Sequence, residues 1–194
     1  MSKLGHDDLY SLEHYARIRD DFRRRVIEHK KLRLLPLGEH ATLHFEDALT
    51  MQYQVQEMLR LERIFEPELI QEELDVYNPL VPDGSNWKAT FMVEYADPAE
   101  RRQALAKLIG IERAVWVRVE GFERVAPVAN EDLERETAEK TSAVHFLRFE
   151  LSADMVAALK AGAGLAAGID HPAYQAVVAT VAEPVRASLV GDLA

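Results

Sequence analysis

One central stretch of the sequence changes its hydrophobic spacing from helical to extended, and the predicted fold is arranged around it. Over 48–65 apolar side chains recur every three or four residues, as on one face of an amphipathic helix. Pro67 suits the first turn of a second helix, because the N–H that proline lacks has no helical acceptor there. A Pro- and Gly-containing turn at 81–86 leads into alternation at 87–95, which predicts a strand.

The rest of the chain shows the same two spacings in an irregular order. Ser11 is a candidate N-cap for the first helix, and Asn130 for a short acidic one. The segment 122–129 is expected to turn back beside the strand before it. We expect further helices over 9–32, 98–109, 130–140 and 153–167 and from Glu183 onward, and further strands over 40–47, 114–121, 144–151 and 173–181.

This irregular order of strands and helices favours an α+β fold over a doubly wound parallel sheet. A hairpin signal around Gly121 indicates antiparallel pairing. The 194 residues contain no internal repeat and no linker long enough to divide them. We therefore predict a single α+β domain over 1–194, with a mostly antiparallel sheet of about five strands packed with helices.

Two carboxylates are oddly placed in the central helices. Glu62 falls in the middle of the apolar arc of the first helix, and Glu73 inside that of the second. A carboxylate buried without a partner costs several kcal/mol, so each needs an ion pair, a proton or a bound cation. We expect Glu62 to be largely buried, with a charged or metal partner. Partners for a purely structural ion pair are Arg60, Arg63, Arg118 and Arg148.

Two histidines are candidates to complete a metal site with Glu62 and Glu73. His44 is on the polar face of its predicted strand, where solvent exposure is the simpler explanation. His145 shares the apolar face of its strand, where a histidine is more often a hydrogen-bonded core residue. Mixed carboxylate and imidazole ligands would suit iron, manganese or zinc. No HExxH motif is present.

The predicted strands also place charges opposite their aliphatic faces. Lys88, Arg118 and Arg148 have this placement, each with a glutamate on the same strand. Cross-strand pairs on a solvated face explain the pattern. A ligand-binding sheet face, where arginines recognise a carboxylate or phosphate, is the functional alternative.

Composition excludes several classes of function. The chain has no cysteine, so disulfides, thiol catalysis and iron–sulfur ligation by its own residues are excluded. A formal net charge of −10 argues against a nucleic-acid binder. No run is long and apolar enough for a membrane span, and the polar N-terminal residues lack a signal-peptide core, so we expect a cytoplasmic location. The segment 17–33 is locally basic, as a solvated helix face or as a contact for an acidic partner.

Four stretches resemble a bacterial family known as domain of unknown function 3501. They are QVQEMLRLERIFEP, ELDVYNPLVPDGSNWKATFMVEY, KTSAVHFLRFEL and GIDHPAY, and the similarity extends over nearly the whole chain. The family brings no established catalytic residues to transfer. The resemblance implies an accessory role in redox or metal handling, with rubrerythrin-like diiron proteins and iron–sulfur redox proteins as partners. This is an association and not an argument from a site.

Three functions therefore compete. The first is metal binding or sensing by Glu62, Glu73, His44 and His145. The second is a non-catalytic interaction module, as a homodimer or as a docking subunit for redox partners. Its candidate contacts are the loop 82–87 and the basic residues Arg23, Arg24, Arg25, Lys30 and Lys31. The third is a metal-free enzyme with Glu62 or Glu73 as acid or base and Arg148 to orient an anionic substrate.

Overall fold

The computed structural model describes residues 3–131, 135, 137 and 139–194, and the protein has the α+β fold that the sequence predicts. The helices are α1 (Leu12–Lys31), α2 (Ala48–Glu62), α3 (Pro67–Tyr77), α4 (Pro98–Lys107), α5 (Ala153–Lys160) and α6 (Glu183–Val190), with 3₁₀ turns η1 (His6–Asp8), η2 (Asn78–Leu80) and η3 (Ile111–Ala114). The strands are β1 (Leu34–Pro36), β2 (Ala41–Glu46), β3 (Asn86–Val93), β4 (Val115–Val119), β5 (Val128–Ala129), β6 (Val144–Glu150), β7 (Leu165–His171) and β8 (Tyr174–Val178).

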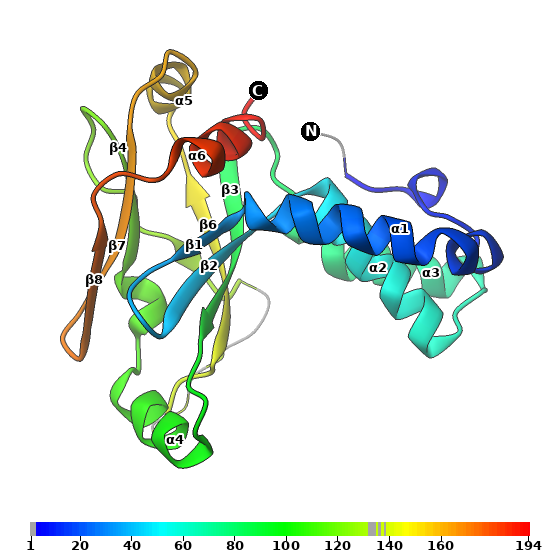
Figure 1. Ribbon diagram of the computed structural model, residues 1–194, viewed down its shortest axis with the longest axis horizontal. Helices are drawn as coiled ribbons and strands as arrows, with labels where there is room; N and C mark the ends of the chain where they lie inside the picture. The colour runs from blue at the N-terminus through cyan, green and yellow to red at the C-terminus, as the bar shows by residue number, and fades with distance from the viewer. Residues whose placement is uncertain (1–2, 132–134, 136, 138) are drawn as a thin grey trace.

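Two antiparallel sheets form the body of the molecule. The larger has the strand order β1-β2-β3-β6-β5, and the smaller has the order β4-β7-β8. Their inner faces share one hydrophobic core, to which Leu43 and Phe91 contribute from the larger sheet and Val117 and Ile169 from the smaller. The sequence predicts the large antiparallel sheet but not the division of the strands between two packed sheets (Figure 1).

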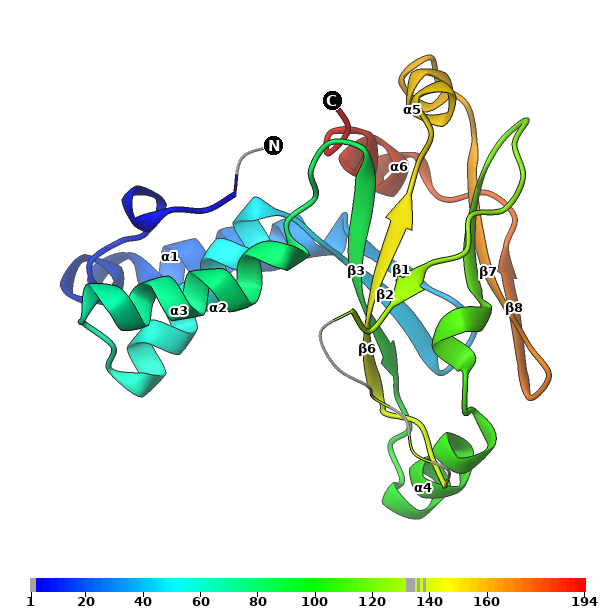
Figure 2. The ribbon, with the colours of Figure 1, turned by 180° about the vertical axis from the view of Figure 1, so that it is seen from behind.

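The first three helices form an arm that projects from the outer side of the larger sheet (Figures 1 and 2). The arm has small hydrophobic clusters of its own: Tyr15 and Phe22 pack with α2 on one side, and Leu59 and Leu74 join α2 to α3 on the other. No helix in the described part of the chain has the length and apolar character needed to cross a bilayer.

Local capping agrees with the sequence at the starts of α1 and α3, whereas the cap of α2, Asp47, is at the end of the strand predicted over 40–47. Ser11 accepts a hydrogen bond from the backbone N–H of His14 and caps α1. Asp47 caps α2 through the N–H of Thr50, and Pro67 is in the first turn of α3.

The prediction of a helix over 153–167 is wrong for the second half of that range. The helix α5 ends at Lys160, Gly162 has a left-handed φ of 101°, and the chain continues as strand β7. Alanine-rich spacing is ambiguous between helix and buried strand, and packing against β4 decides it here. Gly168 is needed in this strand because the ring of Trp116 occupies the space of a Cβ atom.

Two other expectations concern the segment after β4. Val125 pairs with Val117 in a single bridge, but β5 pairs with β6, so only the first part of 122–129 returns beside β4. The acidic helix expected over 130–140 depends on residues 132–134, 136 and 138, which lie outside the described residues.

A buried arginine joins the arm to the body. Arg33 follows α1 and is 2% exposed. Its guanidinium donates to the carbonyl oxygens of Phe45 at 3.0 Å and Glu46 at 3.1 Å, at the end of β2. It also donates to both carboxylate oxygens of Asp192 and to the hydroxyl of Ser188, at 3.3 Å, in the C-terminal region. All five N–H groups thus have acceptors.

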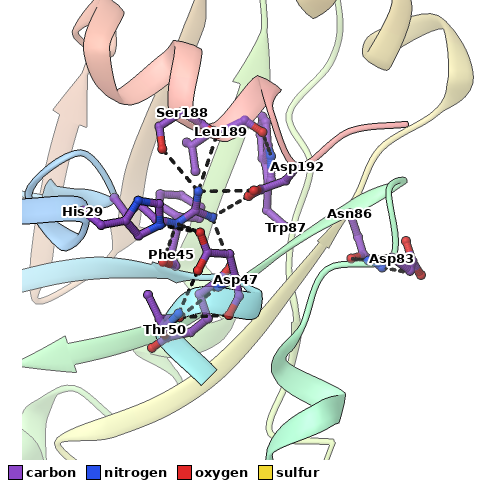
Figure 3. Close-up of polar contacts among 12 residues, drawn as sticks. His29, Phe45, Asp47, Thr50, Asp83, Asn86, Trp87, Ser188, Leu189 and Asp192 are labelled. Carbon is purple, nitrogen blue, oxygen red and sulfur yellow. Dashed lines mark hydrogen bonds and ion pairs between the residues drawn. The ribbon is translucent and has the colours of Figure 1, made fainter. Parts of the chain in front are cut away.

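Asp47 is the second carboxylate at this junction. Its Oδ2 atom lies 3.4 Å from Arg33 Nε and 2.5 Å from His29 Nε2. Side chains from α1, the start of α2 and the region of α6 therefore converge on one point, where Figure 3 labels His29, Asp47, Ser188 and Asp192.

Burial raises the pKa of Asp192, and this effect outweighs the opposing contact with Arg33. Burial of this ion pair therefore carries a desolvation cost. Removing one partner should destabilise the protein far more than replacing both partners with apolar residues. We expect Arg33→Leu to lower the free energy of unfolding by about 3–5 kcal/mol, since it strands Asp192 in the interior. The pair Arg33→Leu/Asp192→Leu should recover a large part of that loss.

Urea denaturation of the wild type, both single variants and the double variant measures this cycle. If the double variant lost as much unfolding free energy as the two single variants together, the two residues would not form a coupled buried pair.

Candidate functional site

The outer face of the larger sheet carries the polar side chains of its strands. Side chains alternate between faces, so the neighbours of the core residues point outward beneath the arm. The register places His44 opposite Thr90, Glu46 opposite Lys88, and Lys88 opposite Arg148. Polar groups that are distant in the sequence thus form one array across β2, β3 and β6.

Two adjoining cavities lie between this array and the arm, with volumes of about 490 and 330 Å³. They share Tyr77, Leu80 and Phe146, so they form one cleft. The first cavity is further lined by Asp75, Val76, Pro79, Lys88, Glu131, Arg135, Leu147 and Arg148. The second is further lined by Lys30, Arg33, His44, Phe45, Glu46, Met51, Gln54, Thr90 and Met92. Both volumes fall in the range of small-molecule sites.

Lys88 is a cation of the first cavity that contacts no carboxylate of the described residues. It is half-buried, and among the described residues it has no hydrogen bond or ion pair. Burial lowers the pKa of Lys88, and the positive charge of Arg148 adds to this effect. Arg148 itself is held by Glu131, with two contacts of 2.7 Å, and by Glu150.

Glu46 and His44 line the second cavity. Glu46 is buried and accepts hydrogen bonds of 2.7 Å from the hydroxyls of Thr50 and Thr90. The Nε2 atom of His44 is buried without a hydrogen-bond partner in the described structure. Burial lowers the pKa of His44, against the opposing effect of Glu46. Its imidazole is therefore kept neutral and keeps one ring nitrogen available to a ligand.

The prediction that Glu62 is buried is wrong. Glu62 is exposed in the last turn of α2, and no hydrogen bond or ion pair joins it to another described residue. The arm ends at this turn, so the apolar arc that Glu62 interrupts is uncovered there; Leu61 is 60% exposed and Phe65 is 67% exposed. Helical spacing places a residue on a face but does not show how far the partner helix extends.

The inward-facing carboxylate of α2 is Glu57. It accepts a hydrogen bond of 2.8 Å from the Tyr15 hydroxyl and two of 2.8 Å from Arg19. The bonds from Arg19 are the main reason that the pKa of Glu57 falls from 4.5 to about 2. Burial and the bond to Glu57 raise the pKa of Tyr15. An internal ion pair is the structural explanation that the sequence offers for Glu62. The helix does contain such a pair, but its glutamate is Glu57.

The other metal candidates are dispersed. Glu73 is half-buried on α3, whereas His145 is fully buried on β6 with its ring nitrogens 3.1 Å from Thr141 Oγ1 and Asn130 Nδ2. His145 therefore fits the hydrogen-bonded core histidine that its apolar face suggests. The residues that the structure describes include no group of three or more His, Cys, Asp or Glu able to hold a metal ion. The metal assignment stays a prediction.

The comparisons with known proteins agree with one another. A protein family described as "Protein of unknown function (DUF3501)" matches residues 3–193. A crystal structure of a novel protein of unknown function from Burkholderia pseudomallei K96243, at 1.90 Å resolution, is 54% identical and superposes with a TM-score of 0.94 over 100% of both chains. No curated protein matches the sequence.

The contrast between Glu57 and Glu62 is testable through acid stability. The folded-state pKa of Glu57 is below its ordinary value, so its contribution is complete above about pH 4.5 and is lost as pH falls toward 2. We expect Glu57→Gln to cost at most about 3 kcal/mol at pH 7 and to flatten the pH dependence of unfolding below pH 5.

Glu62→Gln on the same helix is the matched control, and its effect should stay within about 0.5 kcal/mol. Chemical denaturation at a series of pH values measures both variants. Equal effects of the two substitutions would contradict this assignment.

Proposed function

The chain belongs to the DUF3501 family, and on that premise we propose that it binds a small amphipathic molecule in the cleft between the arm and the larger sheet. The apolar part of the ligand packs against Phe146 and Leu80, and its anionic group meets Lys88. The observation that carries this proposal is a half-buried lysine without a counter-ion in a cavity with apolar walls.

The charge balance of the cavity supports Lys88 as the ligand-binding cation. Arg148 is neutralised by two carboxylates, so its main role is to hold the loop residue Glu131 against the sheet. The ammonium group of Lys88 loses hydration and gains no hydrogen bond or ion pair with the described residues in exchange; the charges of Glu131, Asp83 and Glu150 offset only part of this loss. An anion at this point would supply the missing partner, and the pKa of Lys88 would rise on binding.

Octanoate is a suitable probe because it combines one carboxylate with a short apolar chain. We expect wild-type protein to bind it with chemical-shift changes at Phe146 and Leu80, and Lys88→Met to bind about 10–100-fold more weakly, as for the loss of a charged hydrogen bond. Binding should also weaken as pH rises, since Lys88 loses its proton below the ordinary lysine range.

Lys160→Met, at the end of α5, is the matched control and should bind like wild type. Titration calorimetry and NMR of the three proteins measure these effects. Undiminished affinity in Lys88→Met, or shift changes confined to other regions, would reject the cleft as the site.

A second candidate is protein–protein contact through the far end of the arm. The corner between α2 and α3 exposes Leu61, Phe65 and Leu69, which lie in consecutive turns of the chain. Clustered apolar side chains at the end of a projecting element are typical of interaction sites. This observation favours a homodimer or a docking subunit. The accessory role beside redox proteins would use the same surface.

Sedimentation velocity tests the homodimer form of this candidate. We expect a concentration-dependent dimer in the wild type and a monomer in Leu61→Ser/Phe65→Ser. Glu62→Ser, at the same corner, controls for the change of an exposed side chain. A wild type that remains monomeric at high concentration would exclude self-association.

A further inference from the structure

We propose that Lys88 is a nucleophilic amine that forms a reversible imine with an aldehyde or ketone held in the cleft. This inference rests on the proposed function, because the carbonyl compound would occupy the same cavity. It narrows the ligand to an amphipathic carbonyl compound and adds a covalent step to binding.

The position of Lys88 suits a nucleophile. It lies on β3, the central strand of the five, so neighbouring strands fix its backbone on both sides. Its amine has no ion pair or hydrogen bond with the described residues, and burial and Arg148 outweigh the more distant charges of Glu131, Asp83 and Glu150, which favour the protonated form. Lys31 shows the contrast, because its ammonium contacts both carboxylate oxygens of Glu28 at 2.7 and 2.9 Å.

Arg148 gives the cavity a second feature that favours a neutral amine. It is directly opposite Lys88 in the ladder, and Glu131 and Glu150 hold its guanidinium in place. A fixed cation beside a partly desolvated lysine opposes protonation of the amine, which agrees with the lowered pKa of Lys88. Burial together with a neighbouring cation is how imine-forming lysines are activated.

The proposed step balances without an oxidant or reductant. The nitrogen lone pair of neutral Lys88 attacks the carbonyl carbon, the carbon–oxygen π bond breaks, and one of the two nitrogen-bound protons passes to the oxygen to give a carbinolamine. Loss of the second nitrogen-bound hydrogen as a proton and of the hydroxyl group as water then gives the imine. Phe146, Leu80 and Val76 give the cavity apolar surface, against which the carbon chain of the carbonyl compound would pack.

Octanal matches octanoate in chain length and tests the covalent step. Incubation with octanal and cyanoborohydride reduces an imine to a stable secondary amine, and peptide mapping by mass spectrometry locates it. We expect Lys88 to be labelled faster than Lys160 near neutral pH, because the lowered pKa of Lys88 leaves more of its amine neutral. Saturating octanoate should suppress labelling of Lys88 and leave that of Lys160 unchanged.

Lys88→Arg keeps the positive charge but removes the nucleophile, and it should lose the selective label while remaining folded. If the protein binds octanoate but Lys88 is labelled by octanal no faster than Lys160, the imine is overturned and the proposed binding function stays in place. Rapid labelling of Lys88 that octanoate does not suppress would overturn the shared site. Failure of both octanoate binding and selective labelling would overturn the inference and the proposed function together.

Discussion

The burial of Arg33 is the constraint on which the arrangement of arm and body depends. A guanidinium that is 2% exposed must have acceptors for all its N–H groups, and here they come from β2, from Asp192 and from Ser188 on α6. Arg33, which follows the first arm helix, is thereby fixed to both the sheet and the C-terminal region. Asp47 extends the contact to the start of α2. The hydrophobic clusters of the arm are separate from the main core, so this polar junction helps to fix its angle to the sheet.

The cleft is a consequence of that angle. The arm stands over the outer face of the larger sheet without packing flat on it, and the space left between them is lined by polar strand residues and by apolar residues of α3 and η2. An outward face that would be ordinary solvated sheet becomes a partly desolvated surface. Lys88 and His44 both have lowered pKa values for this reason, with burial as the leading cause in each case.

The two glutamates of α2 differ in burial and in partners, although they are the same residue type on the same helix. Glu57 lies where α1 and α2 are in contact, and Tyr15 and Arg19 from α1 satisfy it. Glu62 lies one turn and a half further on, where α2 is exposed and no helix of the described structure covers it. The same side chain on the same helix is therefore a partly buried ion-pair member at one position and a solvated surface residue at the other. Helical spacing alone does not show whether such a carboxylate is buried. How far the neighbouring helix extends along α2 must also be known.

The sequence by itself determined the elements whose spacing and end signals agree: the arm helices, with Ser11 at the start of α1 and Pro67 at the start of α3, and the alternating faces of β2, β3 and β6. It also placed Lys88 and Arg148 on an outward face and His145 on an inward one. Only the tertiary structure decided which strands pair, that residues after Gly162 form β7 and not a helix, and that the arm covers Lys88. Periodicity is a local property of the chain, whereas strand pairing, burial and loss of hydration depend on contacts between residues that are far apart in sequence.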